Sequence, residues 1–149
     1  MMNYKATSFS YIVFVMFIGC FSACKTYFIP LDSFKQQTQG LNKTPLREVT
    51  TRGPIGEEVT YKTYPIDYIK CLDKHGNPYE LKNSPSIEVR FTYGRNKKTV
   101  FYFDRIYVDD SSVMGSRSRI LGMPKRIPLN SITEIEVQNG KKRYRYVGE

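Results

Sequence analysis

Few side chains in this sequence could act as acid, base or nucleophile. It contains one histidine, His75, and three cysteines, Cys20, Cys24 and Cys71. A Ser–His–Asp or Cys–His mechanism would have to use His75, which lies in a run of turn-forming residues. A zinc site needs more ligands than one histidine and one free cysteine supply. We therefore predict no metal and no cofactor, and keep a hydrolase that uses His75 with an acidic or serine partner as the alternative function.

Two further candidates for chemistry have simpler structural explanations. Asp109 and Asp110 are adjacent, so on a strand they would point to opposite faces, whereas paired-carboxylate catalysis needs both on one cleft wall. We expect them in a turn that continues into two serines. Cys71 lies in a predicted strand over Asp67–Leu72, where we expect a small buried side chain rather than a reactive thiol.

Basic residues are the remaining chemical feature. The chain has 23 Lys and Arg against 14 Asp and Glu, a formal net charge of +9. Such a surface attracts anionic lipid, acidic polymers or nucleic acid. Arg143 and Arg145 alternate with Tyr144 and Tyr146, a pattern shared by the solvated face of a strand and by aromatic–basic surfaces that bind single-stranded nucleic acid. The residues predicted to contact an anionic surface are Arg95, Lys97, Lys98, Lys141, Lys142, Arg143 and Arg145.

The N-terminal segment, residues 1–23, determines where these side chains would act. It carries one charged residue, Lys5, followed by an apolar run that includes Tyr11–Ile18 and by the small residues Ser22 and Ala23. The apolar run is about a dozen residues long, whereas a membrane-spanning helix needs about 20. A charged start, a short apolar middle and a small-residue end are typical of a secretory signal peptide. We therefore predict that residues 1–23 are a signal peptide and that the chain is exported.

The end of this segment, Phe21-Ser22-Ala23-Cys24, resembles the lipobox of bacterial lipoproteins. The two small residues match the family pattern, whereas Phe21 stands where leucine is usual. The resemblance implies that Cys24 is acylated and becomes the first residue of the mature chain. A second candidate, Phe17-Ile18-Gly19-Cys20, carries a bulky residue where a small one is usual. An uncleaved anchor and ordinary cleavage without acylation are the remaining alternatives.

The resemblance is to small bacterial envelope lipoproteins, and it implies an address rather than an activity. It implies a location outside the cytoplasm, with the outer membrane favoured over the inner one, and contact with that membrane through acyl chains such as palmitate. Nucleic acid is the least expected anionic partner of an exported chain. We expect a non-enzymatic binding or scaffolding module whose partner is another envelope protein or an anionic envelope polymer.

Residues 24–48 are predicted to be a polar tether between the anchor and the domain. The segment is rich in Gln, Thr and Lys and contains few β-branched residues. A short helix is expected over residues 33–39, with Asp32 as N-cap and Gly40 as the stop. The alternative is that residues 27–29 dock on the domain.

From residue 49 to residue 149, alternation of apolar and polar residues predicts strands separated by turns. One strand is expected over Val113–Leu121, ended by Gly122-Met123-Pro124. Ile127–Val137 resembles the strand, one-turn 3₁₀ helix and strand of SH3-like small barrels. Asn139-Gly140 predicts a type I′ hairpin turn between the last two strands. We predict one all-β domain, an antiparallel barrel or sandwich of about eight short strands.

Overall fold

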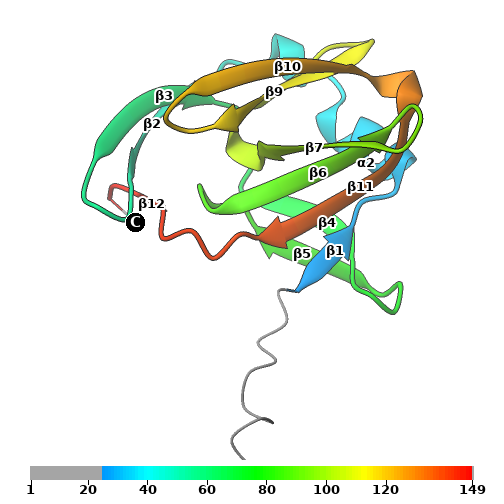
Figure 1. The fold of residues 1–149 in the computed structure, drawn as a ribbon, viewed down its shortest axis with the longest axis horizontal. Coiled ribbons are helices and arrows are strands. Elements are labelled where there is room, and N and C mark those ends of the chain that lie inside the picture. The colour runs from blue at the N-terminus through cyan, green and yellow to red at the C-terminus, as the bar shows by residue number, and fades with distance from the viewer. Residues whose placement is uncertain (1–24, 149) are drawn as a thin grey trace, which may run out of the picture.

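The computed structural model describes residues 25–148 and shows an antiparallel β fold with one short α-helix, α2 (Leu31–Thr38) (Figure 1). One-turn 3₁₀ helices lie at Leu41–Lys43, Phe103–Arg105 and Leu129–Ser131. The strands of the described residues are β1 (Thr26–Phe28), β2 (Arg47–Arg52), β3 (Glu58–Thr63), β4 (Tyr68–Leu72), β5 (Pro78–Lys82), β6 (Ile87–Tyr93), β7 (Lys97–Tyr102), β8 (Ile106–Val108), β9 (Ser112–Ser118), β10 (Gly122–Pro128), β11 (Ile132–Asn139) and β12 (Arg145–Tyr146).

These strands form three sheets. The large sheet has the order β5-β4-β1-β11-β6-β7, and the two smaller sheets have the orders β10-β9-β8 and β12-β2-β3. None of these orders returns to its first strand, so no sheet built from residues 25–148 closes into a barrel. The prediction of an all-β domain with antiparallel strands is confirmed. The predicted number is wrong, because residues 25–148 contain twelve strands instead of about eight.

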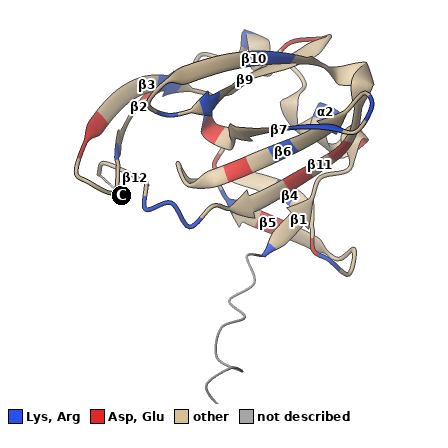
Figure 2. Cartoon of the chain, in the orientation of Figure 1, with Lys and Arg blue, Asp and Glu red and all other residues tan. Residues whose placement is uncertain are grey.

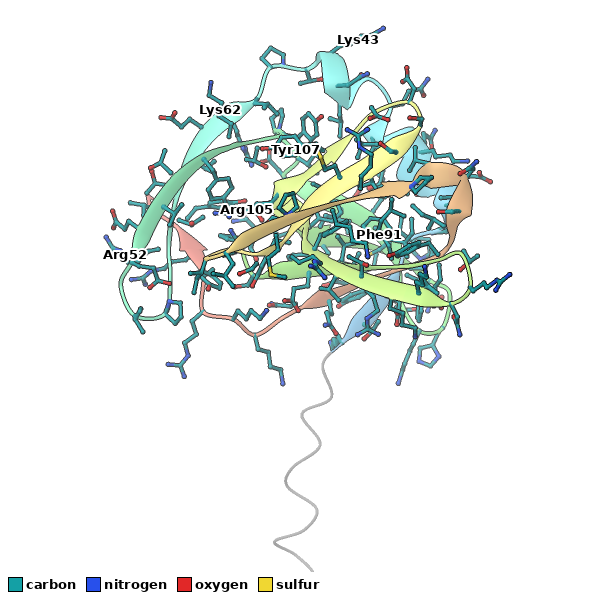
Figure 3. All side chains as sticks on the ribbon, turned by 45° about the horizontal axis from the view of Figure 1, so that its top comes forward. Lys43, Arg52, Lys62, Phe91, Arg105 and Tyr107 are labelled. Carbon is teal, nitrogen blue, oxygen red and sulfur yellow. The ribbon has the colours of Figure 1, made fainter. Side chains whose placement is uncertain are left out.

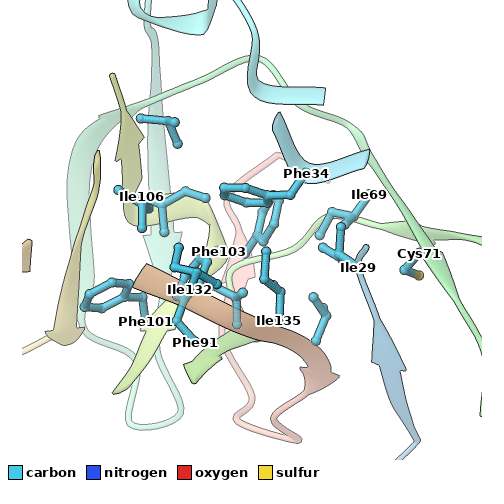
Figure 4. Packing of buried hydrophobic residues seen from close by; sticks show 14 of the residues in the cluster. Ile29, Phe34, Ile69, Cys71, Phe91, Phe101, Phe103, Ile106, Ile132 and Ile135 are labelled. Atoms are coloured by element: carbon cyan, nitrogen blue, oxygen red, sulfur yellow. The ribbon is translucent and has the colours of Figure 1, made fainter. Parts of the chain in front are cut away.

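The hydrophobic core lies on one face of the large sheet (Figure 4). Val89 pairs with Val137 across β6 and β11, and Phe91 pairs with Ile135, so four apolar side chains share that face. All four are at most 2% exposed. The ring of Phe34, from α2, meets the ring of Phe91 edge-on, with 5.6 Å between the ring centroids. The helix therefore covers this face of the sheet.

The sheet β10-β9-β8 covers the part of the core next to β7. Its apolar side chains Ile106, Val113 and Ile127 are at most 3% exposed. Gly115 of β9 lies against Phe101 of β7, and a Cβ atom at this glycine would lie only 2.5 Å from the ring carbon Cγ. The missing side chain lets the two sheets approach closely.

Most of the predicted tether belongs to the domain, and the prediction of a spacer over residues 24–48 is wrong for its described part. Strand β1 lies inside the large sheet, between β4 and β11. Tyr27, Ile29 and Phe34 are at most 7% exposed. Backbone hydrogen bonds on both edges of β1 and three large buried side chains hold a segment whose average composition is polar. The docking alternative is therefore correct for Tyr27 and Ile29, whereas Phe28 is 36% exposed.

Helix α2 is displaced toward the N-terminus from its predicted span. It begins directly after Pro30 and ends at Thr38. Gly40 follows with a φ of +76°, the left-handed conformation expected of a residue that stops a helix. Asp32, the predicted N-cap, lies in the first turn instead. There its negative charge is next to the positive end of the helix dipole.

The strand predicted over Val113–Leu121 is the first half of a hairpin. Strand β9 ends at Ser118, and β10 begins at Gly122, which pairs with Ser118. The residues predicted to end the strand therefore begin the next one. Pro124 is tolerated there because β10 is an edge strand, where a missing N–H leaves no gap in the ladder. The 3₁₀ helix predicted between two strands is confirmed at Leu129–Ser131.

The hairpin predicted at Asn139-Gly140 is wrong. Strand β11 pairs with β1 and β6, whereas β12 pairs with β2 in another sheet. Gly140 does not have the positive φ that a type I′ turn needs. Its N–H donates to the Ser86 carbonyl at 2.9 Å, and the Ser86 hydroxyl bonds to the carbonyl oxygens of Lys142 and Tyr144. These bonds direct the chain along the start of β6 toward β2 instead of back along β11.

Candidate functional site

The seven basic residues predicted to contact an anionic surface fall into two groups (Figure 2). Strand β6 separates the groups, because Tyr93 at one end pairs with Lys97 and Ile87 at the other end pairs with Asn139. Its seven residues span about 20 Å. The structure therefore does not join the predicted residues into one surface. Arg95, Lys97 and Lys98 lie at the turn between β6 and β7, and Lys141, Lys142, Arg143 and Arg145 follow β11.

Two members of the second group also have structural partners. Lys142 Nζ lies 2.5 Å from a carboxylate oxygen of Glu88 and 3.1 Å from the hydroxyl of Tyr102. Partial burial lowers the pKa of Lys142, but the hydrogen bonds to Glu88 and Tyr102 raise it, and the net shift is upward. Arg145 lies in β12, opposite Arg52 of β2. Lys142 therefore links the segment after β11 to β6 and β7, besides contributing a positive charge to the surface.

A buried ion pair joins Asp104 and Arg119. Nη2 of Arg119 lies 2.7 Å from Oδ1 of Asp104, and the two side chains are 4% and 0% exposed. The hydroxyl of Tyr61 donates to Oδ2 of Asp104, and the hydroxyl of Tyr146 lies 3.4 Å from the same oxygen. Burial, followed by the charge of Asp104, raises the pKa of Tyr61 to about 12. Neutral hydroxyl groups therefore satisfy the hydrogen-bonding capacity of the Asp104 carboxylate that Arg119 leaves free, as a buried ion pair requires.

Two tyrosine rings enclose the guanidinium of Arg119. Its Cζ lies 4.2 Å from the ring centroid of Tyr102 and 5.0 Å from that of Tyr144, within the range of a cation–π contact. Sequence reasoning missed this cluster, because Arg119 looked like any other of the 23 basic residues. The position of Asp104 directly after the apolar run Thr99–Phe103 is the signal that could have indicated a buried carboxylate.

An apolar groove lies between β3 and the sheet β10-β9-β8, with Arg105 on its wall (Figure 3). The guanidinium of Arg105 stacks on the ring of Tyr61, 4.2 Å from its centroid. Nη1 donates to the carbonyl oxygen of Arg119 at 3.4 Å, and Nε is buried without a hydrogen-bond partner in the described chain. The groove, called the Arg105 groove below, has a volume of about 430 Å³ and is lined mainly by Val59, Tyr61, Arg105, Tyr107, Met114 and Pro124.

The Arg105 groove offers one cation next to an apolar surface. No Asp or Glu among residues 25–148 forms an ion pair with Arg105. A guanidinium binds carboxylate or phosphate groups through paired hydrogen bonds, which makes it the natural anchor for an anionic partner. Exposed apolar side chains extend the surface along the turn between β9 and β10 and into β10, where Ile120 in the turn is 83% and Met123 in β10 is 41% exposed. The arrangement suits recognition of an anionic group carried on an apolar body.

A wider cavity of about 930 Å³ lies between α2 and the turn that contains Asp109. The carboxylate of Asp109 accepts hydrogen bonds from the backbone and hydroxyl groups of Ser111 and Ser112. It also lies 3.0 Å from Nη1 of Arg126. These hydrogen bonds hold the pKa of Asp109 below its usual range. The turn predicted for Asp109 and Asp110 is confirmed, and the carboxylate of Asp109 is already used by that turn.

His75 and Cys71 lie in or next to the hairpin of β4 and β5. His75 is exposed in the turn, where its backbone N–H donates to Asp73 Oδ1 at 2.8 Å. No hydrogen bond within the described chain joins its imidazole to a serine or acidic side chain. Cys71 is 4% exposed and free, and burial raises its pKa to about 11. The prediction of a buried cysteine on a strand is confirmed, and its low reactivity stays a prediction.

The predicted lipidation residue Cys24 and its alternative Cys20 lie outside the described residues. The first described residue, Lys25, directly follows Cys24 in the sequence and directly precedes β1. No helix within residues 25–148 is long and apolar enough to cross a membrane. The acylation of Cys24 therefore stays a prediction from the sequence.

No protein-family model matches this chain, and no curated protein and no solved structure matches it. Its function therefore has to be argued from its own residues.

Proposed function

We propose that this protein is a lipid-anchored protein of the bacterial cell envelope that acts as a non-enzymatic binding or scaffolding module. The resemblance of Phe21-Ser22-Ala23-Cys24 to a lipobox supports the anchor.

The observation that carries the binding role is the state of Arg105. A cationic side chain lies on the wall of an apolar groove, stacked on Tyr61 and with no carboxylate partner in the described chain. Its Nε is buried without a hydrogen-bond partner in the described chain, and a buried donor left unsatisfied costs stability. The partner that fits is an anionic group on an apolar body, such as an acidic segment of another envelope protein or an anionic envelope polymer.

The anchor is tested by metabolic labelling with a radioactive fatty acid. We expect the label to enter the wild-type protein and to be lost in Cys24→Ala, with Cys20→Ala as the matched control that keeps it. Loss of label in Cys20→Ala with retention in Cys24→Ala would move the anchor to Cys20. Absence of label from the wild type would contradict the proposal of a lipid anchor.

The binding role is tested by pull-down from native membranes with the full-length chain. Arg105→Gln removes the cation of the groove, and we expect it to lose the bound partner. Arg117→Gln is the matched control, because Arg117 is exposed on β9 next to the groove residue Ser116, and adjacent residues of a strand point to opposite faces. Digestion of the eluate with protease or with glycan-degrading enzymes separates a protein partner from a polymer. Equal recovery with both variants would contradict a role for the Arg105 groove.

A further inference from the structure

The topology places the start of β1 at one particular end of the large sheet. Thr26 pairs with Gln138 near the end of β11, and Phe28 pairs with Leu72, the last residue of β4. Because both neighbours run antiparallel to β1, the turn between β4 and β5 and the segment after β11 lie at the same end as Thr26. In Figure 1 the described chain begins at β1, with the turn between β4 and β5 on one side of it and the start of the segment after β11 on the other. This end is called the proximal end below.

The proximal end is rich in exposed basic side chains (Figure 2). The acidic residues Asp73 and Glu88 also lie at this end, and both are engaged in hydrogen bonds. Asp73 accepts backbone N–H groups within the turn, and Glu88 binds Lys142. The basic residues at this end are Lys25, Lys74, Lys141, Lys142 and Arg143.

The other end of the sheet is too far away to share the same contact. The turn that carries Arg95, Lys97 and Lys98 is separated from the proximal end by the length of β6, about 20 Å. Interactions between exposed charges are largely screened beyond about 8 Å at physiological ionic strength. A surface that meets the proximal end therefore attracts the turn at the other end only weakly.

We infer that the proximal end of the large sheet rests on the anionic phospholipid headgroups of the membrane that holds the anchor. This inference rests on the proposed acylation of Cys24. Only Lys25 then separates the acylated residue from β1, and one extended residue spans about 3.5 Å. The domain is consequently held against the bilayer by a very short connection, and the end that meets the headgroups is the basic one. Juxtamembrane Lys and Arg residues are attracted to anionic lipid in this way.

Depth probes on the mature, lipidated chain in phosphatidylglycerol vesicles test the orientation. A fluorophore is attached at His75→Cys, which is proximal, or at Arg95→Cys, which is distal, and is quenched by spin-labelled lipid. The unsubstituted chain reports background, which is low because Cys71 is buried. We expect quenching at residue 75 to exceed that at residue 95 by more than about twofold, because Arg95 lies beyond the distal end of β6, a strand about 20 Å long. Equal quenching, or stronger quenching at residue 95, would overturn the inference.

A charge test separates electrostatic contact from proximity imposed by the anchor alone. In the His75→Cys chain, the pair Lys74→Gln and Arg143→Gln removes proximal charge, and the matched pair Lys97→Gln and Lys98→Gln removes the same charge from the distal turn. We expect only the proximal pair to reduce quenching, and only in phosphatidylglycerol rather than phosphatidylcholine vesicles. An equal effect of both pairs, or no effect of either, would overturn the role of anionic headgroups.

Flotation of the chain with vesicles distinguishes failure of the inference from failure of the proposed function. A chain that does not float contradicts the lipid anchor itself. A chain that floats and shows equal quenching at the two probe positions leaves the anchor in place and contradicts the orientation.

Discussion

Replacing Asp104 with asparagine should strongly destabilise the domain. The substitution keeps the size of the side chain but leaves the guanidinium of Arg119 buried, 4% exposed, without the carboxylate that lies 2.7 Å away. Removing one partner of a buried ion pair costs about 3–5 kcal/mol. A domain of this size has a free energy of unfolding of about 5–15 kcal/mol, so the loss is a large part of the total. With a urea dependence of about 2 kcal/mol per M, the unfolding midpoint should fall by about 2 M.

Urea unfolding followed by far-UV circular dichroism measures this effect. The matched control is Asp67→Asn, because Asp67 pairs with Arg47 at 2.8 Å but the two side chains are 66% and 38% exposed. The control should lose less than about 1 kcal/mol. The double variant Asp104→Asn with Arg119→Met should regain part of the loss, because no buried charge remains. Equal midpoints for Asp104→Asn and Asp67→Asn would refute the reasoning.

Three further predictions follow from the packing and the pKa shifts. The pKa of Tyr61 rises from 10.0 to about 12 on folding. The contribution of Tyr61 to the free energy of unfolding should therefore be fully present below pH 10 and be lost as the pH rises to about 12. Tyr61→Phe should make the free energy of unfolding, measured by urea titration, depend less steeply on pH between about 10 and 12. The same pH dependence in the variant and the wild type would contradict the raised pKa of Tyr61. Cys71 should resist maleimide at pH 8 in the folded chain and react in urea; rapid native labelling would contradict its burial. Gly115→Ala should destabilise by about 1–3 kcal/mol and be partly rescued by Phe101→Leu, because the new Cβ would lie 2.5 Å from the ring; a neutral Gly115→Ala would show that the sheets can separate.

Sequence patterns predicted local structure well where neighbouring residues determine it. The alternation of apolar and polar residues after residue 49 indicated strands, and Ile87–Tyr93, which shows this alternation, is β6 in the centre of the core. The turn at Asp109 and the 3₁₀ helix at Leu129–Ser131 were predicted from short runs of residues, because their hydrogen bonds connect residues close in sequence.

Predictions failed where distant partners decide the outcome. Asn139-Gly140 has the composition of a hairpin turn, but the carbonyl and hydroxyl groups of Ser86 bind the segment that follows β11 and lead it to β2. Residues 24–48 have the composition of a linker, but the open position between β4 and β11 accepts β1 as a strand. A strand with backbone partners on both edges needs few apolar side chains of its own.

The sequence by itself determined the all-β class, the buried state of Cys71 and the exposed turn of His75, and its first 24 residues carry the prediction of an anchor. These properties depend on side-chain type and on spacing along the chain. The tertiary structure alone decided that the basic residues form two groups about 20 Å apart and that Asp104 meets Arg119. Both depend on strand register and on contacts between residues far apart in sequence, which local patterns do not encode.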